Sequence, residues 1–568
     1  MEAKAKYFER PWLKFYPEGV PANVEIPERS LPEAFDQVTS KYSDRTALIF
    51  YGNKISFGKL REEVDRFATA LHELGIEKGD KVALYLLNSP QFIIAYFGSL
   101  KAGATLTPIS PVYTSIEVKH QLEDSEAQSI VCQDFLYENV EKAGVGLKNV
   151  ILTNIGEYLP LSKKLAGRSV LGRYGKMEAP SPQVIESHGF HQFQKLIKKY
   201  PPNPPKIEFN PREDIVALPY TGGTTGLPKG AVLTHHNLLA CQMQVQAFWP
   251  TFEEGEEVVP ALLPFYHIYG QVVVMLDGLL LGSTLILFTT PDLEEILSAM
   301  ERYGATVFYS VPTAYQFLKD YDKTDRFNWK GLKIITSGAD TLHESTVNDW
   351  ERRTGAKIIE GYGLTECSAV SHVNPLGRPK VGSFGVPLPN VMAAVVDPET
   401  SEFLPPGEIG ELLIEGPNIM KGYWKRPEDT KESLIELDGK TWLRTGDLVR
   451  MDEDGYFFFY DRKKDMIKYK GYSVFAREIE EVLHQHPKVK TAGVLGVPDP
   501  DLGQLIKAIV VLETDARGKV SEEEIIKYCE ENLAHYKVPK IVEFRGELPK
   551  TDVGKGSHRE LREELEEE

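Results

Sequence analysis

The sequence predicts an α/β protein with a large N-terminal domain of mostly parallel sheets covered by helices, followed by a small α+β domain. Its 568 residues far exceed the roughly 150 residues of one common domain, so more than one domain is expected. Strand and helix signals alternate through residues 1–400, which is typical of parallel strands joined by helices. After residue 460 the chain becomes rich in charge and glycine and then follows a short α+β pattern.

The first alternating elements can be assigned from local signals. Residues 45–50 and 81–87 are apolar runs that predict two buried strands. Between them, Ser56 is placed to cap a helix whose apolar side chains recur at helical spacing until Gly75 ends it. Parallel strands connected in this way bring their carboxyl-terminal loops to one edge of the sheet, where such folds bind ligands.

The C-terminal elements predict a compact unit with its own core. Amphipathic helices are expected at 477–487 and 521–536. We therefore divide the chain at Lys464, into an N-terminal domain of residues 1–463 and a C-terminal domain of residues 464–568. Apolar runs within the second domain predict strands at 489–497, 505–513 and 540–545.

Composition excludes several classes of protein. The formal net charge of −18 argues against a general nucleic-acid binder, which needs lysine and arginine to neutralise phosphates. The four cysteines form no CxxC pair, which disfavours a disulfide framework or a thiolate zinc site. No secretory signal is seen at the start. The most apolar stretch, 271–288, is interrupted by Asp277 and glycines, which predicts a buried helix leading into a strand and not a membrane span. We expect a cytoplasmic protein.

One segment, residues 156–210, breaks the alternation of strands and helices. It ends in a proline-rich connector and contains a basic cluster that could make weak peripheral contact with an anionic membrane surface. A solvated insertion is the alternative. The cluster consists of Lys163, Lys164, Arg168, Arg173 and Lys176.

The segment with the most specific chemistry is YTGGTTGLPKG at residues 220–230, after a strand-like run. Glycine lets backbone N–H groups face a ligand, threonine adds hydroxyl donors, and Lys229 adds a positive charge, a combination that suits a polyphosphate. The segment is not a Walker A loop, because the Gly-Lys-Ser/Thr ending is absent. A flexible surface turn is the alternative. The candidate ligands are Thr221, Gly222, Gly223, Thr224, Thr225, Gly226 and Lys229.

This segment resembles the phosphate loop of the AMP-forming acyl-CoA synthetases, a superfamily that also contains aryl-CoA ligases, peptide-synthetase adenylation domains and beetle luciferases. The usual pattern has serine where this chain has Gly222, and glycine there is typical of long-chain fatty acyl-CoA synthetases. The family's other motifs follow in order, so the resemblance covers nearly the whole chain. It implies an N-terminal adenylation domain and a mobile C-terminal domain.

Three motifs of the N-terminal domain extend the resemblance. LPFYHIYG resembles the border of the acyl pocket, which implies His267 and Tyr269 there, although a satisfied core histidine is the alternative. SGAD resembles the adenine-side strand end. In GYGLTE, Tyr362 offers a flat face for a purine and Glu366 is a hard oxygen ligand for Mg²⁺, although a strand-to-turn corner would also fit. The implied nucleotide ligands are Gly338, Ala339, Glu360, Gly361, Tyr362, Gly363 and Thr365.

The later motifs complete the resemblance. In WLRTGD, Asp447 follows a tight turn, and its counterpart in the family binds both ribose hydroxyls, while a surface Asx turn is the alternative. DRKKD matches the linker, so Arg462 would reach the ribose or phosphate and Lys464 would be the hinge. PKTDVGKGSHR places Lys555 in the catalytic lysine position. The coenzyme A side is implied at Lys468, Lys470 and Gly471.

The resemblance implies a two-step reaction. A carboxylate attacks ATP to give an acyl adenylate and pyrophosphate, and coenzyme A then forms the thioester after the C-terminal domain rotates about Lys464. The implied partners are ATP, Mg²⁺ bound by Glu366, coenzyme A and a small-molecule carboxylic acid, and the oligomeric state is not indicated. The implied catalytic residues are Lys555, Glu366, Lys229 and Arg462.

Several functions remain as alternatives. Gly222 and the 156–210 insertion favour a fatty acid, whereas the HIYG sequence would also suit an aryl-acid ligase of the coumarate type. Another adenylate-forming enzyme, including one with a luciferase-like oxidative step, would share the motifs. An unrelated phosphotransferase would release ADP and would not explain the later motifs. A non-enzymatic nucleotide- or acyl-binding protein would be indifferent to Lys555.

Overall fold

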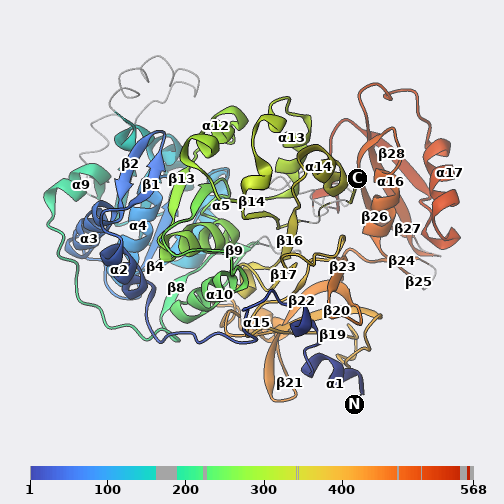
Figure 1. Ribbon diagram of the computed structural model, residues 1–568, viewed down its shortest axis with the longest axis horizontal. Coiled ribbons are helices and arrows are strands. Elements are labelled where there is room, and N and C mark those ends of the chain that lie inside the picture. The colour runs from blue at the N-terminus through green and yellow to red at the C-terminus, as the bar shows by residue number, and fades with distance from the viewer. Residues whose placement is uncertain are drawn as a thin grey trace.

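The structure is a computed structural model that describes residues 2–160, 189–221, 227–340, 342, 344–469, 472–499, 502–549, 560–562 and 564. Figure 1 shows the sheets and helices of the N-terminal part at one end of the long axis and the last elements of the chain at the other. The α/β class and the small C-terminal α+β unit are as predicted. The basic cluster of the 156–210 segment lies outside the described residues.

The largest sheet has seven strands in the order β11-β8-β4-β3-β5-β6-β7, and all neighbours run parallel except β11 and β8. Helix α3 (Phe57–Glu73) is capped by Ser56, as predicted, and packs against α4 (Pro90–Lys101), which is buried along its whole length. The remaining helices of this part are α5 (Ser115–Ser125), α6 (Tyr137–Ala143) and α9 (Phe193–Lys199). The strands are β3 (Lys81–Tyr85), β4 (Thr105–Pro108), β5 (Ser129–Gln133), β6 (Asn149–Thr153), β7 (Phe190–Gln192), β8 (Ile215–Ala217) and β11 (Leu233–Thr234).

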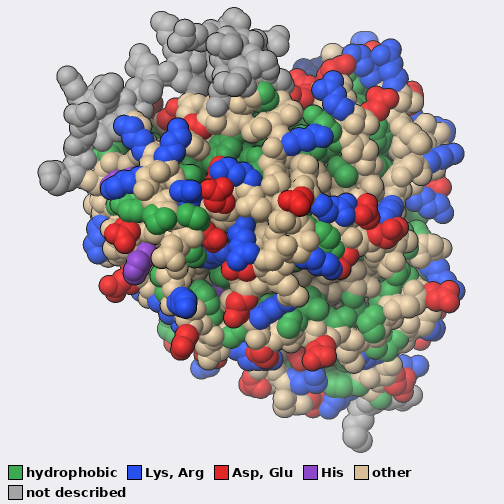
Figure 2. All heavy atoms as spheres, turned by 60° about the vertical axis from the view of Figure 1, so that its left-hand side comes forward, with side chains coloured by type: hydrophobic (Ala, Val, Ile, Leu, Met, Phe, Trp, Pro, Cys, Tyr) green, Lys and Arg blue, Asp and Glu red, His purple; other side chains and the backbone are tan. Residues whose placement is uncertain are grey.

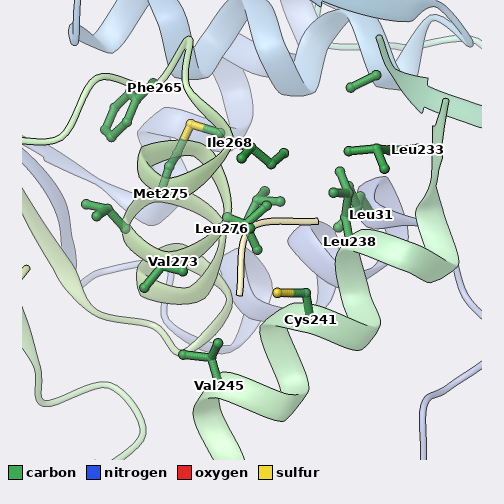
Figure 3. Packing of buried hydrophobic residues seen from close by; sticks show 14 of the residues in the cluster. Leu31, Leu233, Leu238, Cys241, Val245, Phe265, Ile268, Val273, Met275 and Leu276 are labelled. Atoms are coloured by element: carbon green, nitrogen blue, oxygen red, sulfur yellow. The ribbon is translucent and has the colours of Figure 1, made fainter. Parts of the chain in front are cut away.

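A second sheet, ordered β12-β13-β1-β2, is parallel except for its edge strand β2. The apolar stretch 271–288 forms a buried helical run that ends in β13, as predicted. Figure 3 shows this run packed against α10, with Val273 and Val245 on the two neighbouring helices. The elements are α2 (Leu31–Lys41), β1 (Thr46–Phe50), β2 (Asn53–Ser56), α10 (His235–Phe248), β12 (Val258–Ala261), the π-helix η5 (Gly270–Leu276), α11 (Asp277–Leu280) and β13 (Thr284–Leu287).

A third sheet carries the nucleotide motifs and begins with three parallel strands, β14, β15 and β16, which continue into two short antiparallel ones. Its elements are α12 (Leu293–Tyr303), β14 (Val307–Ser310), α13 (Pro312–Asp320), β15 (Ile334–Ser337), α14 (Glu344–Thr354), β16 (Ile359–Tyr362), β17 (His372–Val373) and β18 (Val386–Pro387).

The last sheet of the N-terminal part is antiparallel throughout, which the alternating pattern did not predict. The N-terminal helix α1 (Glu2–Phe8) packs against β19 at its edge. The predicted tight turn before Asp447 is wrong: Gly446 has φ of 70° within the long strand β22, whose register against β20 shifts there. The elements are β19 (Met392–Val396), β20 (Ile409–Glu415), α15 (Pro427–Ser433), β21 (Leu434–Leu437), β22 (Lys440–Met451) and β23 (Phe457–Arg462).

The C-terminal elements share a separate hydrophobic core that includes Ile479, Val494 and Ile525. The chain leaves the antiparallel sheet at Arg462 and enters the C-terminal sheet at Ile467, so the predicted boundary at Lys464 lies in the turn between them. The elements are β24 (Ile467–Tyr469), β25 (Tyr472–Val474), α16 (Ala476–His484), β26 (Val489–Asp499), β27 (Gly503–Leu512), α17 (Glu522–Asn532) and β28 (Ile541–Arg545).

Charged side chains of both signs lie on the described part of the surface that Figure 2 shows. On the described part of the face in Figure 2, basic and acidic side chains are interspersed. That distribution agrees with the acidic net charge of −18. No helix in the described part of the chain combines the length and the apolar character needed to cross a membrane.

Candidate functional site

A cleft of about 2450 Å³ lies between the N-terminal sheets and the C-terminal elements. The carboxyl ends of β15 and β16 open into it, as expected for ligand binding in an α/β fold. Thr221 and Lys229, on either side of the glycine-rich loop, also line it. Thr221 ends the strand before the loop, and Lys229 begins the strand after it. Most of the described residues singled out by the motifs therefore lie around one space, although Glu360 and Asp447 are not among the residues that line it.

The loop that follows β15 approaches the acyl motif closely. Gly338 follows the strand directly, and a Cβ at this position would lie 3.1 Å from the Tyr269 ring. The next residue, Ala339, has φ of 69°, a left-handed conformation that is rare for a residue with a side chain and is common at functional sites. The Tyr269 hydroxyl is 3.0 Å from Thr336 Oγ1. These contacts bring the predicted adenine and acyl sides together.

A chain of hydrogen-bonding groups joins Tyr362 to the linker. The Tyr362 hydroxyl donates to Asp447 Oδ2 at 2.5 Å, and Arg462 Nε lies 3.1 Å from Asp447 Oδ1. Asp447 and Arg462 face each other in the β22–β23 register, so the strand pairing itself sets this geometry. The buried Asp447 carboxylate raises the pKa of Arg462, and burial together with Asp447 raises that of Tyr362. Gly363 is required by packing, because a Cβ would lie 1.8 Å from the Ala369 carbonyl oxygen.

Tyr362 is supported from behind by other rings. Its ring lies 4.5 Å from that of Phe384, and the His372 ring lies 4.9 Å from that of Phe457. Burial lowers the pKa of His372 to about 3, so this imidazole is neutral at physiological pH. The rings behind Tyr362 therefore form a neutral aromatic wall, and the charged neighbours Asp447 and Arg462 lie at its hydroxyl end.

Glu360 is a buried carboxyl group on the second residue of β16. Its Oε2 accepts a hydrogen bond from the Leu342 backbone N–H at 3.3 Å. Burial raises its pKa to about 7, opposed by that N–H group and by Arg477 of the C-terminal helix α16. Burial is therefore the main influence on the charge state of this predicted nucleotide ligand, and Arg477 has the smallest effect of the three.

The stem of the glycine-rich loop is a short antiparallel hairpin. Strands β9 (Tyr220–Thr221) and β10 (Lys229–Gly230) pair, and the Tyr220 hydroxyl donates to Asp124 Oδ2 of α5 at 2.7 Å. Both ends of the loop are thus fixed to the fold. The predicted ligands Gly222, Gly223, Thr224, Thr225 and Gly226 lie outside the described residues.

The two charged groups predicted on the phosphate side have protein partners that the motifs did not reveal. Lys229 forms an ion pair with Asp429 and lies 5.5 Å from the centre of the Tyr423 ring. The Tyr423 hydroxyl donates to Glu366 Oε1 at 2.7 Å. Tyr423 and Asp429 lie far along the chain from Lys229, in a segment with no glycine-rich pattern, so only the folded chain brings them together.

The structure fits a Mg²⁺ ion that is bound together with a phosphate. No cluster of three or more histidine, cysteine, aspartate or glutamate side chains suited to a metal is found among the described residues. The Glu366 carboxylate lines the cleft near Lys229, and Mg²⁺ is commonly held by one or two carboxylates together with substrate phosphates and waters. Glu366 is the residue that would hold it, with Thr365 beside it in the cleft wall.

An apolar branch of the cleft extends beyond His267 and Tyr269. It reaches Val245 on α10 and Val273 on the π-helix (Figure 3), and also Trp249 directly after α10. All three side chains are otherwise buried in the core. Gly270 lets the chain fold tightly before the π-helix, since a Cβ would lie 2.2 Å from the Pro264 carbonyl oxygen. Single π-helical turns are frequent at functional sites. This branch suits a hydrophobic group.

The C-terminal elements close one side of the cleft. Lys464 lines the cleft, whereas Lys468 lies on the exposed face of β24 and not among the lining residues. Arg477 crosses between the two parts, with Nη1 donating to the Phe459 carbonyl oxygen of β23 at 3.2 Å. Lys470, Gly471 and Lys555 lie outside the described residues, while Pro549 before Lys555 and Glu560 after it line the cleft.

Comparison with known proteins identifies the family. The pattern of the AMP-binding enzyme family matches residues 35–424, and that of the AMP-binding enzyme C-terminal domain matches residues 478–555. The chain belongs to the AMP-binding enzyme family. A long-chain-fatty-acid–CoA ligase of Bacillus subtilis is 38% identical to it over 559 residues, which cover 98% of each chain. A probable 4-coumarate–CoA ligase of Dictyostelium discoideum is 30% identical over 548 residues, covering 94% of this AMP-binding enzyme and 95% of the relative.

Solved structures share the fold, and one of them is available in an ATP-bound and an apo form. ATP-bound MatB from Rhodopseudomonas palustris matches with a TM-score of 0.81 at 29% identity, covering 94% of this chain and 99% of that one. The apo form of the same protein covers the same shares at 30% identity but has a TM-score of 0.72. The AMP-binding enzyme described here is therefore closer in overall arrangement to the ATP-bound form.

Proposed function

We propose that this chain is an AMP-forming acyl-CoA ligase that activates a fatty acid in two steps. The acid first becomes an acyl adenylate with release of pyrophosphate, and coenzyme A then takes the acyl group as a thioester. One observation carries the proposal: a single cleft joins a nucleotide side at Tyr362 and Arg462, a phosphate side at Lys229 and Glu366, and an apolar branch. Relatives named long-chain-fatty-acid–CoA ligases are 36% to 38% identical over nearly the whole chain.

The first step is limited mainly by charge repulsion. A carboxylate oxygen attacks the α-phosphorus of ATP, the bond from that phosphorus to the oxygen bridging to the β-phosphate breaks, and pyrophosphate leaves. We assign Lys229 and the N–H groups of residues 222–226 to the departing phosphates. Mg²⁺ at Glu366 would supply additional positive charge on the same phosphates. We assign Lys555 to the carboxylate and the α-phosphate, and one such preorganised donor is typically worth about 3–4 kcal/mol.

The nucleoside is held by groups whose geometry is already fixed. Tyr362 offers a ring face to the purine, and Gly338 and Ala339, which follow the neighbouring strand β15, line the same cleft. The Asp447 carboxylate, with two acceptor oxygens, suits the two ribose hydroxyls, and its ion pair with Arg462 orients it. These assignments explain why the Asp447–Arg462 pair is built into paired strands.

The second step needs a different arrangement of the C-terminal domain. Lys468, which is exposed here, belongs with Lys470 and Gly471 to the segment that we assign to the coenzyme A step. A rotation about Lys464 would withdraw the Lys555 segment and bring this one to the cleft, which is a hinge-type change. The thiol then attacks the acyl carbonyl carbon, and AMP leaves with the oxygen that it received from the acid.

The choice of acid follows from the apolar branch. Val245, Trp249 and Val273 extend the cleft between two helices into the core, which favours a flexible aliphatic chain. The greater similarity to the fatty-acid ligase of Bacillus subtilis than to the coumarate ligase points the same way. Membrane contact through residues 156–210 and a cytoplasmic location stay predictions.

The test is a pyrophosphate-release assay with the purified chain, ATP and Mg²⁺ across a series of fatty acids and aromatic acids. We expect release with aliphatic acids that rises with chain length and is far lower with coumarate or benzoate. Preference for the aromatic acids would replace the fatty-acid assignment by the aryl-acid ligase. Release of ADP, or of no phosphate product with any acid, would contradict the proposal as a whole.

A further inference from the structure

The segment of residues 420–433 enters the cleft between Lys229 and Glu366. Its path is fixed by backbone hydrogen bonds, from Trp424 N–H to the Gly230 carbonyl and from Met420 N–H to the Glu366 carbonyl, both 2.8 Å long. At Gly422 a Cβ would lie 2.5 Å from Thr430, so only glycine allows the chain to pass there. The segment is therefore a rigid part of the phosphate side.

Asp429 is the charged residue of this segment that contacts the stem of the glycine-rich loop, at Lys229. It lies in the first turn of α15, and its carboxylate pairs with the Lys229 ammonium group. The side chains are 30% and 23% exposed, so the pair is only partly screened by solvent. Both residues line the cleft, where Lys229 is also the cation closest in sequence to the glycine-rich loop.

Lys229 cannot contact both the Asp429 carboxylate and the phosphates of ATP with full strength at the same time. When the β- and γ-phosphates of ATP enter, Lys229 must exchange part of its contact with Asp429 for contact with phosphate. The Asp429 carboxylate then lies near a more highly charged anion of the same sign, and like charges at short range repel. The repulsion acts equally on pyrophosphate after the bond to the α-phosphate has broken.

We propose that Asp429 is a resident counter-ion of Lys229 that occupies the phosphate side in the free enzyme and promotes release of the pyrophosphate product. This inference depends on the proposed function, because pyrophosphate is the product of its first step. Asp429 acts through Lys229 and by its own charge, and is therefore a positioning residue. Release of pyrophosphate clears the phosphate side before the thiol reacts and prevents reversal of adenylate formation.

The proposed role and a purely structural role of Asp429 predict opposite changes in the affinity for phosphate ligands when its charge is removed. If Asp429 only held Lys229 in place, its removal would weaken the binding of every phosphate ligand. If it competes with phosphate, its removal strengthens that binding. Asp429→Asn keeps the size of the side chain and removes its charge, and Glu428→Gln is a matched control because Glu428 is the exposed neighbour on the same helix.

The experiment measures the affinity of the full chain for pyrophosphate with Mg²⁺ by titration calorimetry, and the inhibition of adenylate formation by pyrophosphate. For Asp429→Asn we expect binding about 5- to 10-fold tighter than for the parent, with correspondingly stronger inhibition. Asp429→Glu should remain within about twofold of the parent, as should Glu428→Gln. The Michaelis constant for the fatty acid should not change.

Unchanged or weaker pyrophosphate binding by Asp429→Asn, in a variant whose melting temperature matches the parent, would overturn the inference. Equal tightening by Glu428→Gln would also overturn it, because the effect would then come from net charge. If the parent enzyme itself releases no pyrophosphate with any acid, the proposed function fails first. If the parent is active and only the Asp429→Asn result is negative, the proposed function stands without this inference.

Discussion

The two ends of the cleft are built in different ways. On the nucleoside side, Tyr362, Asp447 and Arg462 bind one another in strands that are already paired, and an aromatic wall supports them. On the phosphate side, Lys229 and Glu366 are held by Asp429 and Tyr423, whose contacts a substrate must share or replace. A preorganised surface can bind with little rearrangement, whereas paired charges must exchange partners. This difference fits the proposed first step, in which the nucleoside end of ATP stays bound as the adenylate and the β- and γ-phosphates leave as pyrophosphate.

The largest effect on activity is expected from Lys555, whose positive charge we place between the nucleoside side and the phosphate side. Lys555→Ala should slow adenylate formation about 10²- to 10³-fold, because a preorganised donor to the reacting oxygens is lost. Thioester formation from added acyl adenylate should change little. Single-turnover assays of each half-reaction measure the two rates separately. Equal losses in both half-reactions would contradict the assignment of Lys555.

On the nucleoside side, Asp447→Asn should raise the Michaelis constant for ATP about 10- to 100-fold, since hydrogen bonds from ribose to a charged acceptor are lost and Arg462 loses its partner. The Michaelis constant for the fatty acid should stay within about twofold of the parent, because the apolar branch is not altered. Steady-state kinetics with each substrate varied in turn gives both constants. An equal rise in both would show a general loss of structure.

On the phosphate side, Tyr423→Phe keeps the ring beside Lys229 and removes the hydrogen bond to Glu366. The Mg²⁺ concentration for half-maximal adenylation should rise about 5- to 10-fold, because the carboxylate is no longer oriented. At saturating Mg²⁺ the rate should recover nearly to that of the parent. A loss of rate that Mg²⁺ does not restore would show that Tyr423 has another role.

The smallest effect is expected in stability at Glu360. Burial raises the pKa of Glu360 in the folded state to about 7, compared with 4.5 in the unfolded state. As the pH rises between these two values, the unfolded state loses its proton first. The carboxyl group therefore destabilises the fold over this range. Glu360→Gln should therefore raise the melting temperature by about 2–4 °C at pH 8. Below pH 4.5 the difference should vanish, since the carboxyl group is then protonated in both states. Calorimetric melting curves from pH 4 to pH 8 test this, and a constant difference across the range would contradict it.

The grouping of Gly338, Tyr362 and Arg462 around one cleft could be expected from sequence, whereas the protein partners of Lys229 and Glu366 could not. Gly338 and Tyr362 lie in short motifs at the ends of β15 and β16, where the local pattern indicates both the element and its place in the sheet, whereas Asp447 lies inside β22. Asp429 and Tyr423 meet Lys229 and Glu366 only through tertiary packing, and a tyrosine or an aspartate in a polar segment gives no local signal. The bulge at Gly446 was missed for the same reason, because it depends on the register between two distant strands.

The account depends most on the order of events, in which the acid is joined to AMP before the thiol reacts. Turnover with a fatty acid labelled with ¹⁸O in its carboxylate tests this directly, by mass spectrometry of the AMP and pyrophosphate formed. We predict one labelled oxygen in each AMP molecule and none in pyrophosphate, because the attacking carboxylate oxygen stays on the α-phosphorus when the thioester forms. Unlabelled AMP, or label in pyrophosphate, would contradict the account.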